Sequence, residues 1–528
     1  MARTSSGIWV TALATVLVLG MLAALLATVA ANALAWFWPV PVERVELADG
    51  TVYMGQPVER RRNPVTGGER LKFKIGARDL DGRDFVWVEE AEIRRRVEES
   101  GLVRVVRTAY GDVFGRIEAL EAGGFGPEAA DLESLLEIGR RERKRLRKLV
   151  RRTQRVRRPL TRLETRLALL ERSGRADTPE GRREIATLEE RLEEVRERLA
   201  PELEALAGKR RDLERRLEEA GLVVDTGRGS VRIPLGHVVE VVPNGLSLPS
   251  RLGWALRHLV AFLFSEPREA NTEGGIYPAL FGTVLLVLLM SVLVMPLGVV
   301  TAVYMTEYAT DGPLLRLATQ AVQNLAGVPS IVFGMFGMAF FIYAVGGSVD
   351  RIFFADRLPT PTFGTGGILW ASLTLALLTV PVVVVATREG LSAVPRDWRD
   401  AALALGATRW QTLRRIVIPA AMPGILTGLI LAVSRAAGEV APLMLTGAVK
   451  MAPSLPLDGT PPFLHLERKF MHLGFHIYDL SMQSPNVEAA KPAAFATTLV
   501  LLALVVALNL TAILVRRRLR RAFRGSVV

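Results

Sequence analysis

The sequence predicts a mainly α-helical membrane protein with six transmembrane helices and an extramembrane α+β insert. Half of the 528 residues are hydrophobic, yet 23% are charged. The two kinds of residue are segregated, because charged residues concentrate between about residues 40 and 250 and most apolar runs lie outside that block. Runs of about 20 apolar residues are long enough to cross the core of a bilayer. Within the charged block, leucines recur at heptad spacing, which predicts two long packed helices.

The first apolar run extends over Ile8–Trp38. Its Ala33-Leu34-Ala35 resembles a signal-peptidase site, but the apolar part of a signal peptide has about 7–15 residues and this run is about twice as long. We therefore expect residues 1–40 to form a retained membrane anchor, although cleavage is the alternative. Trp36 and Trp38 fit an aromatic belt at the far end of that anchor.

Five further spans are predicted, and basic residues define their orientation. The spans are Ile276–Tyr304, Leu325–Val345, Gly367–Thr387, Gly424–Thr446 and Ala493–Val515. The basic residues are Arg516, Arg517, Arg518, Arg520, Arg521 and Arg524 in the C-terminal tail, and Arg388, Arg396, Arg399, Arg409, Arg414 and Arg415 in the loop before the fifth span. Short basic loops and tails stay in the cytoplasm. Both termini are therefore expected inside, and residues 41–250 outside, where a long domain escapes the charge rule.

The insert at residues 41–250 is expected to begin and end as a β module. Val45–Met54, Leu71–Ile75 and Phe85–Val88 are rich in strand-forming residues and are separated by Asp-Gly turn signals. Val223–Val242 is again strand-like, and we expect it to return to the module that contains the first strands.

Between these strands, residues from about 128 to 221 predict an antiparallel coiled-coil hairpin. Two heptad patterns are separated by Ser173-Gly174, and Thr178-Pro179 is a typical helix start. At 1.5 Å per residue, each arm of about 40 residues would reach about 60 Å. Pro159 and Pro201 lie inside the arms and are expected to kink them.

The first arm carries a dense basic stretch. Its members are Arg140, Arg141, Arg143, Lys144, Arg145, Arg147, Lys148, Arg151, Arg152, Arg155, Arg157 and Arg158. We interpret it as a solvated helix face that pairs with the acidic second arm; contact with anionic headgroups or with an acidic partner is the alternative.

Composition also limits the chemistry of the chain. A net charge of +13 would suit a nucleic-acid partner, but the membrane spans and the placement of the arginines explain it better. The chain has no cysteine, no phosphate-binding GxxxxGK[ST] loop, and five histidines without metal-ligand spacing. We therefore expect no enzymatic activity, no ATP hydrolysis and no metal site on this chain.

The loop at residues 388–419 contains DAALALGATRWQTLRRIVIP, which begins at Asp400 and continues through Ala401, Ala402 and Gly406. Small residues let a short helix enter a cleft on a partner, and glycine permits the bend that follows. The spacing resembles the cytoplasmic coupling loop of ATP-binding-cassette importer permeases, with aspartate where glutamate is usual. A plain helix–turn–helix between two spans is the alternative.

The fifth predicted span contains two opposite charges, Arg435 and Glu439, four residues apart and so on one helix face. A charge inside a span is costly and marks a pathway or a buried pair. A guanidinium suits a tetrahedral oxyanion because its planar fork donates two parallel hydrogen bonds. We therefore expect this pair in a substrate pathway; mutual neutralisation for packing alone is the alternative.

Several segments resemble the PstA-type permease subunit of bacterial phosphate importers. They are NTEGG at 271–275, PLG at 296–298, TEY at 306–308, GVPSIVFGMFG at 327–337 and RAAGEVAPL at 435–443. The resemblance implies an inner-membrane permease core at residues 251–528. It also implies a second, PstC-like permease, a dimer of ATPases that binds the ATP and magnesium, and a periplasmic phosphate-binding protein.

The insert at residues 41–250 departs from that family, whose loop at this place is short. We rank a scaffold role for the insert above a catalytic one. Its long hairpin also motivates an alternative function for the whole chain. In that alternative, ATPase motion moves the hairpin to regulate an envelope partner and no solute crosses the membrane. Polar residues inside the spans argue against this alternative, because a lever needs none.

Overall fold

The computed structural model describes residues 2–524 except 109, 130, 173–177, 269–270, 460 and 485–486. The predicted break at Ser173-Gly174 therefore lies outside the described residues. Contacts divide the chain into two units: residues 37–260, and residues 1–36 together with 261–528. Helix α5 (Leu248–Phe264) begins in the first unit and ends in the second.

The 37–260 unit contains two five-stranded antiparallel sheets. The first sheet has the order β4-β3-β2-β1-β5 and the second β10-β6-β7-β8-β9. The strands are β1 (Glu43–Leu47), β2 (Val52–Arg62), β3 (Glu69–Lys74), β4 (Phe85–Glu89), β5 (Ile93–Val97), β6 (Leu102–Arg107), β7 (Val113–Glu121), β8 (Gly221–Asp225), β9 (Ser230–Pro234) and β10 (Val238–Pro243). A short helix, α2 (Arg78–Asp81), follows β3. The β-type segments of the sequence are thus strands, and Asp49-Gly50 forms the turn between β1 and β2, with Gly50 at φ 86°.

The strands after the hairpin, β8 to β10, return to the same unit as the first strands, as expected. They do not join the sheet of β1 to β4 but complete a second sheet with β6 and β7. Hydrogen-bonded partners in this sheet, such as Leu120 and Leu222, lie about a hundred residues apart in the sequence, so no local pattern reveals the pairing.

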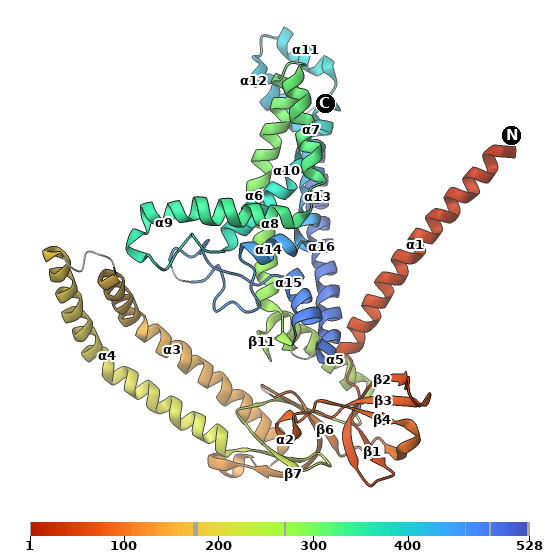
Figure 1. The fold of residues 1–528 in the computed structure, drawn as a ribbon, viewed down its shortest axis with the longest axis vertical. Coiled ribbons are helices and arrows are strands. Elements are labelled where there is room, and N and C mark those ends of the chain that lie inside the picture. The colour runs from red at the N-terminus through yellow and green to blue at the C-terminus, as the bar shows by residue number, and fades with distance from the viewer. Residues whose placement is uncertain are drawn as a thin grey trace. The chain divides into compact units, whose positions relative to one another are not determined.

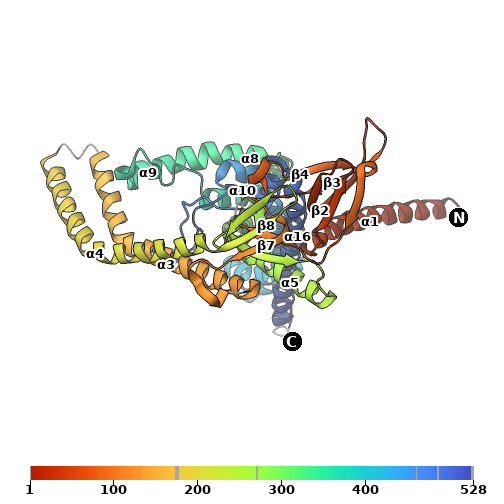
Figure 2. The same ribbon diagram turned by 90° about the horizontal axis from the view of Figure 1, so that it is seen from below.

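Two 41-residue helices, α3 (Leu132–Arg172) and α4 (Pro179–Glu219), follow β7 and precede β8 in the sequence. They lie side by side (Figures 1 and 2). They are antiparallel, because Arg152 pairs with Glu202 and Arg166 with Glu184. Thr178 caps α4, since its side chain accepts a hydrogen bond from Gly181 N. Both helices continue through their internal prolines and curve in Figure 1. Heptad packing of the coiled-coil type stays a prediction.

Within the described residues, six helices are long and apolar enough to cross a membrane. These candidate spans are Trp9–Phe37, Tyr277–Tyr308, Ser330–Phe353, Ile368–Ser392, Arg409–Gly438 and Val487–Arg518. The helices of this unit are α1 (Ala2–Phe37), α6 (Tyr277–Val303), α7 (Pro313–Ala326), α8 (Ser330–Phe336), α9 (Gly347–Phe353), α10 (Ile368–Ser392), α11 (Arg396–Ala404), α12 (Arg409–Thr412), α13 (Ile418–Gly438), α14 (Ala441–Thr446), α15 (Leu473–Tyr478) and α16 (Val487–Arg524), with a short β11–β12 ladder (Pro267–Arg268 with Glu273–Gly274).

The bounds of the five later spans all differ from those predicted, and in two of them a break in the helix is the reason. The third begins at Ser330 rather than Leu325, because Pro329 is the N-cap that separates α8 from α7. The fifth ends at Gly438 rather than Thr446, because Glu439 is extended and α14 is a separate helix. An uninterrupted apolar run in the sequence therefore hides a break in the helix.

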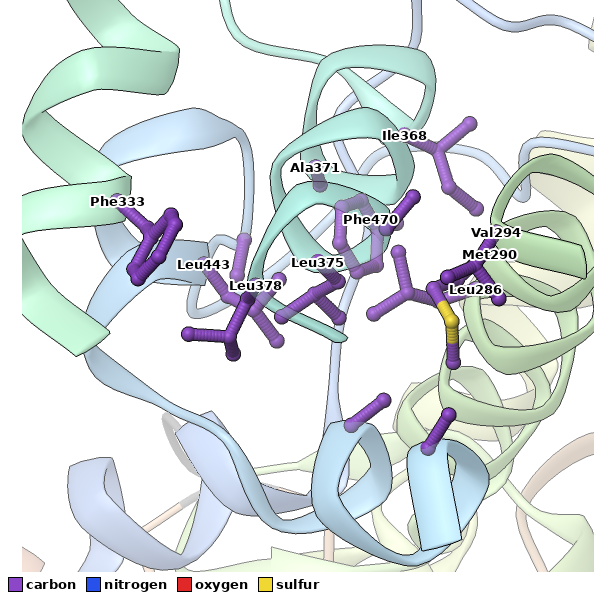
Figure 3. Packing of buried hydrophobic residues seen from close by; sticks show 14 of the residues in the cluster. Leu286, Met290, Val294, Phe333, Ile368, Ala371, Leu375, Leu378, Leu443 and Phe470 are labelled. Carbon is purple, nitrogen blue, oxygen red and sulfur yellow. The ribbon is translucent and has the colours of Figure 1, made fainter. Parts of the chain in front are cut away.

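The core of this unit lies where α6, α8, α10 and α14 meet (Figure 3). Leu286, Met290 and Val294 of α6 face Ile368, Ala371 and Leu375 of α10, and Phe470 fills the space between them. Small residues let helices in a membrane approach closely. Gly390 of α10 and Gly424 of α13 act in this way, since a Cβ at Gly424 would lie 2.6 Å from Gly390 Cα.

Candidate functional site: coupling segment and intramembrane ion pair

The coupling segment consists of two short helices, α11 and α12, joined by a glycine bend. Gly406 has φ 84°, a conformation that favours glycine. Thr408 and Gln411 then form a capping box at the start of α12. The predicted glycine bend is therefore present, and α12 leads through a π-helical turn, Leu413–Val417, into α13.

Three of the four predicted coupling residues are exposed. Asp400, Ala401 and Gly406 lie at the surface, whereas Ala402 is buried. Large apolar side chains surround them: Trp398, Leu403, Leu405 and Trp410 are all exposed. Aromatic side chains are enriched where proteins bind one another, so this surface has the composition of a docking site.

Arg399 fastens the coupling segment to two other helices. Its guanidinium donates to the carbonyl oxygens of Leu391 at 2.8 Å and Val394 at 2.6 Å, and it pairs with Glu307 Oε1 at 2.9 Å. Glu307 lies in the π-helical turn, Tyr304–Tyr308, that extends α6. A cavity of about 120 Å³ lies beside this contact. Movement of the coupling segment would therefore pull on α6 and α10 directly.

Sequence reasoning counted Arg399 only among the basic residues of the loop. The signal that could have identified its role is the TEY segment, which contains Glu307. The two residues are 92 positions apart, so the sequence did not suggest that they pair.

Arg435 and Glu439 also lie together, but not within one helix as predicted. Arg435 is in the last turn of α13, and Glu439 follows the helix in extended conformation. The distance from Arg435 Nε to Glu439 Oε1 is 3.6 Å, which is an ion pair but too long for a hydrogen bond. The cation also suits the negative end of the α13 dipole.

The guanidinium fork of Arg435 keeps its capacity to bind an anion. No other polar contact of Arg435 exists among the described residues, so both terminal nitrogens lack a partner there. The side chains of Arg435 and Glu439 are 31% and 17% exposed, respectively. An ion that reached the pair could therefore accept hydrogen bonds from the fork without first displacing Glu439.

Two of the segments that carry the family resemblance pack against each other, and a third holds a distant part of the chain. A Cβ on Gly334 of the GVPSIVFGMFG segment would lie 2.7 Å from Pro442 Cα of RAAGEVAPL. Asn271 of NTEGG donates to the carbonyl oxygen of Lys450 and to Asp479 Oδ2, both at 3.0 Å. The segment that contains the Arg435–Glu439 pair is therefore packed against α8.

Two histidines of this unit, His472 and His476, are buried. His472 Nδ1 accepts a hydrogen bond from Gly474 N at 3.1 Å, at the start of α15. Burial lowers the pKa of His472 to about 3. Burial also lowers the pKa of His476 to about 4, although Asp479 opposes the shift. Within the described residues, no group of three acidic, histidine or cysteine side chains is arranged to hold a metal.

Six candidate spans, with two short helices leading into the fifth, define a multi-pass membrane protein of the permease class. Residues 294–524 match the family model described as "Binding-protein-dependent transport system inner membrane component". A probable phosphate transport system permease protein PstA from Methanocaldococcus jannaschii is 30% identical over 48% of this chain and 78% of its own length. The chain belongs to this family, and within it to the PstA type of phosphate permease.

Other relatives show the same similarity. A probable ABC transporter permease, YqgI of Bacillus subtilis, is 32% identical over 43% of this chain and 74% of its own length. The phosphate transport system permease protein PstA 1 of Mycobacterium tuberculosis (strain CDC 1551 / Oshkosh) is 39% identical over 40% of this chain, which spans 63% of that relative's length. A bacterial alginate importer of known structure superposes with a TM-score of 0.36 at 16% identity over 50% of this chain and 83% of its own.

Proposed function

We propose that this chain is the permease subunit of an ATP-driven importer of inorganic phosphate. The observation that carries the proposal is the Arg435–Glu439 pair, in which a guanidinium with an unoccupied fork ends a membrane helix. Phosphate presents pairs of oxygens at the spacing that such a fork binds. The names of the PstA-type relatives agree with this substrate.

In this proposal, Glu439 orients Arg435 through Nε while the two terminal nitrogens bind the passing ion. The pair lies where α13 ends, and in transporters the breaks between membrane helices are typical places for substrate sites. A loosely held cation suits transport, because an ion must bind strongly enough to enter and weakly enough to leave. The pathway would form at the interface with a second, PstC-like permease and would open by rocking of helix bundles.

A dimer of ATPases would bind the surface around Asp400, Ala401, Ala402 and Gly406. These residues would transmit closure of the ATPases to the spans, and the Arg399–Glu307 contact would carry the motion to α6. ATP and magnesium would bind to the ATPases, so this chain would have no enzymatic activity of its own. A periplasmic phosphate-binding protein would deliver the ion from outside.

We infer that both termini lie in the cytoplasm and that residues 41–250 lie in the periplasm, as the placement of the arginines favours. The insert would then be a scaffold toward the binding protein, the partner permease or the cell envelope. The relatives named above do not support the alternative in which the hairpin acts as a lever without transport.

Uptake of labelled phosphate tests the proposal. The measurement uses cells without other phosphate uptake systems, with and without the gene for this chain, and compares labelled sulfate in the same cells. We expect phosphate uptake to be lost without the chain and restored by it, while sulfate uptake does not change. Unchanged phosphate uptake, or loss of sulfate uptake instead, would contradict the proposal.

A further inference from the structure

Helix α5 has a row of large apolar side chains that are largely exposed. Leu248, Leu252, Leu256, Val260 and Phe264 follow one another at four-residue steps and are between 49% and 71% exposed. Residues four apart lie on one face of a helix. We call this row the α5 stripe. A continuous apolar row of this kind marks a surface that something else covers.

The opposite side of α5 is already packed, so the helix cannot turn to bury the stripe. Trp254 and Phe262 are 5% and 2% exposed. The rings of Trp254 and His258 lie 4.7 Å apart, and Phe37 meets the edge of His258 at 5.6 Å. These contacts fix which face of α5 remains open.

The last turn of α5 is joined directly to the first turn of a membrane span. Ile276 N donates to Phe262 O at 2.8 Å, and Tyr277 N, at the start of α6, donates to Ser265 O at 3.2 Å. Gly275 makes this approach possible, since a Cβ there would lie 2.4 Å from Ser265 O. The stripe therefore ends at the level where α6 begins.

A second span ends at the same place. Trp36, in the last turn of α1, packs edge-on against Phe262 with ring centroids 5.1 Å apart. Side chains along α1, such as Leu25 and Leu34, are exposed and form a surface suited to lipid. The last turn of α5, at Phe262, thus lies against the end of a candidate span that carries tryptophan.

The polar edge of α5 is basic. Arg257 is exposed and lines a cavity of about 580 Å³ together with Arg140, Ser250 and Trp254. The Nε1 atom of Trp254 is buried and has no hydrogen-bond partner among the described residues. An arginine beside an apolar stripe is a residue that meets phosphate headgroups at a membrane surface.

From these observations we infer that α5 is an interfacial helix. The α5 stripe inserts between the headgroups and acyl chains of the leaflet in which α1 ends and α6 begins, and Arg257 faces the headgroups. The occupant of the stripe is lipid. This attachment would fix the end of the 37–260 unit at the membrane, independently of what the permease transports.

Depth-dependent quenching tests the inference, and the absence of native cysteine makes it practicable. Single fluorescent labels are placed on the full chain at Leu252→Cys or Leu256→Cys, in vesicles of phosphatidylethanolamine and phosphatidylglycerol. Ser250→Cys, exposed on the other side of α5, is the matched control. Val65→Cys on the β2–β3 turn is the reference for a label in water, and Leu288→Cys on α6 is the reference for a label in the bilayer.

We expect lipid-borne bromine to quench the labels at Leu252 and Leu256 several-fold more than those at Ser250 and Val65, and to an extent similar to Leu288. Aqueous iodide should show the reverse order. The inference is overturned if the stripe labels respond as Val65 does. It is overturned equally if they escape both quenchers, because a protein partner or a second copy of the chain would then cover the stripe.

Discussion

Both units pair a buried carboxylate with a cation, as Asp112 and Asp479 show, but the permease unit also contains one, Asp350, that only backbone N–H groups satisfy among the described residues. In the 37–260 unit, Asp112 lies between Lys74 and Arg104, at 3.1 and 2.9 Å. In the permease unit, Asp350 at the end of the third span accepts backbone N–H groups from Thr362, Phe363 and Gly364 at 2.7–3.1 Å, and no described cation pairs with it. Asp112 and Asp350 are each 1% exposed.

The difference between Asp112 and Asp350 follows from the local surroundings of each carboxylate. Lys74 and Arg104 lie on strands, and their long side chains reach inward while staying partly exposed to water. Burial would raise the pKa of Asp112, but the charges of Arg104 and Lys74 lower it to about 2. Near a membrane helix end, a loop that folds over a carboxylate can supply backbone N–H groups without bringing a second charge into an apolar region.

Asp112→Ala gives the largest expected change in stability. It leaves Lys74 and Arg104 without their shared anion, and breaking such a pair costs about 3 kcal/mol, at the lower end because both cations are partly exposed. Hydrogen exchange of the full chain, followed by mass spectrometry, should show faster exchange in peptides from residues 37–260. Exchange in α6 and α10 should not change. An equal increase of exchange in both units would contradict the expectation that only the 37–260 unit is destabilised.

Asp350→Ala should cost somewhat less, about 2 kcal/mol, because three backbone N–H groups lose their acceptor but no cation is left behind. Thermal unfolding of the purified transporter measures this loss. Asp350→Asn is the matched variant, since its single acceptor oxygen should recover part of the stability. If the alanine variant were as stable as the parent, contacts other than those of Asp350 would hold the loop.

Acid should weaken the permease unit through its buried histidines. The pKa values of His472 and His476 are lowered by burial, so the unfolded chain binds protons that the folded chain does not. Stability is therefore complete above about pH 6.5 and falls below it, by up to about 1.4 kcal/mol per pH unit for each histidine. Thermal unfolding between pH 7 and pH 5 measures the slope, and His472→Gln should reduce it. The same slope in that variant would exclude His472 as its source.

Deletion of residues 131–219 should have the smallest effect on transport. The hairpin of α3 and α4 leaves and re-enters the second sheet at β7 and β8, whose ends are paired at Glu121 and Gly221. A short linker can therefore replace it. We expect phosphate uptake to persist, whereas the lever alternative predicts that the chain loses its only output.

The sequence predicted the permease unit better than the insert, for a physical reason. Each span is a local pattern of about 20 apolar residues, so its existence can be seen without knowing its neighbours. Its ends are set by single residues such as Pro329 and Glu439, which interrupt a helix inside a continuous apolar run. Strands β6 and β7 were not predicted, because they pair with β10 and β8, which follow the hairpin in the sequence.

In the candidate site, too, some features could be predicted from the sequence and others could not. Arg435 and Glu439 stand out in the sequence, because charges in an apolar run are conspicuous. Only the structure shows that they lie at the end of α13 and that Arg435 Nε is 3.6 Å from Glu439 Oε1. The pairs Glu307–Arg399 and Asn271–Asp479 join residues 92 and 208 positions apart, and no periodicity connects them.

The most direct test of the central claim is phosphate uptake by the assembled transporter with Arg435→Ala. Leu431→Ala, an exposed position one turn earlier on α13, is the control, and co-purification of the ATPase confirms assembly. The account predicts that Arg435→Ala abolishes uptake, that Arg435→Lys retains little because a lysine lacks the planar fork, and that Leu431→Ala transports normally. Normal uptake by Arg435→Ala in an assembled transporter would contradict the account.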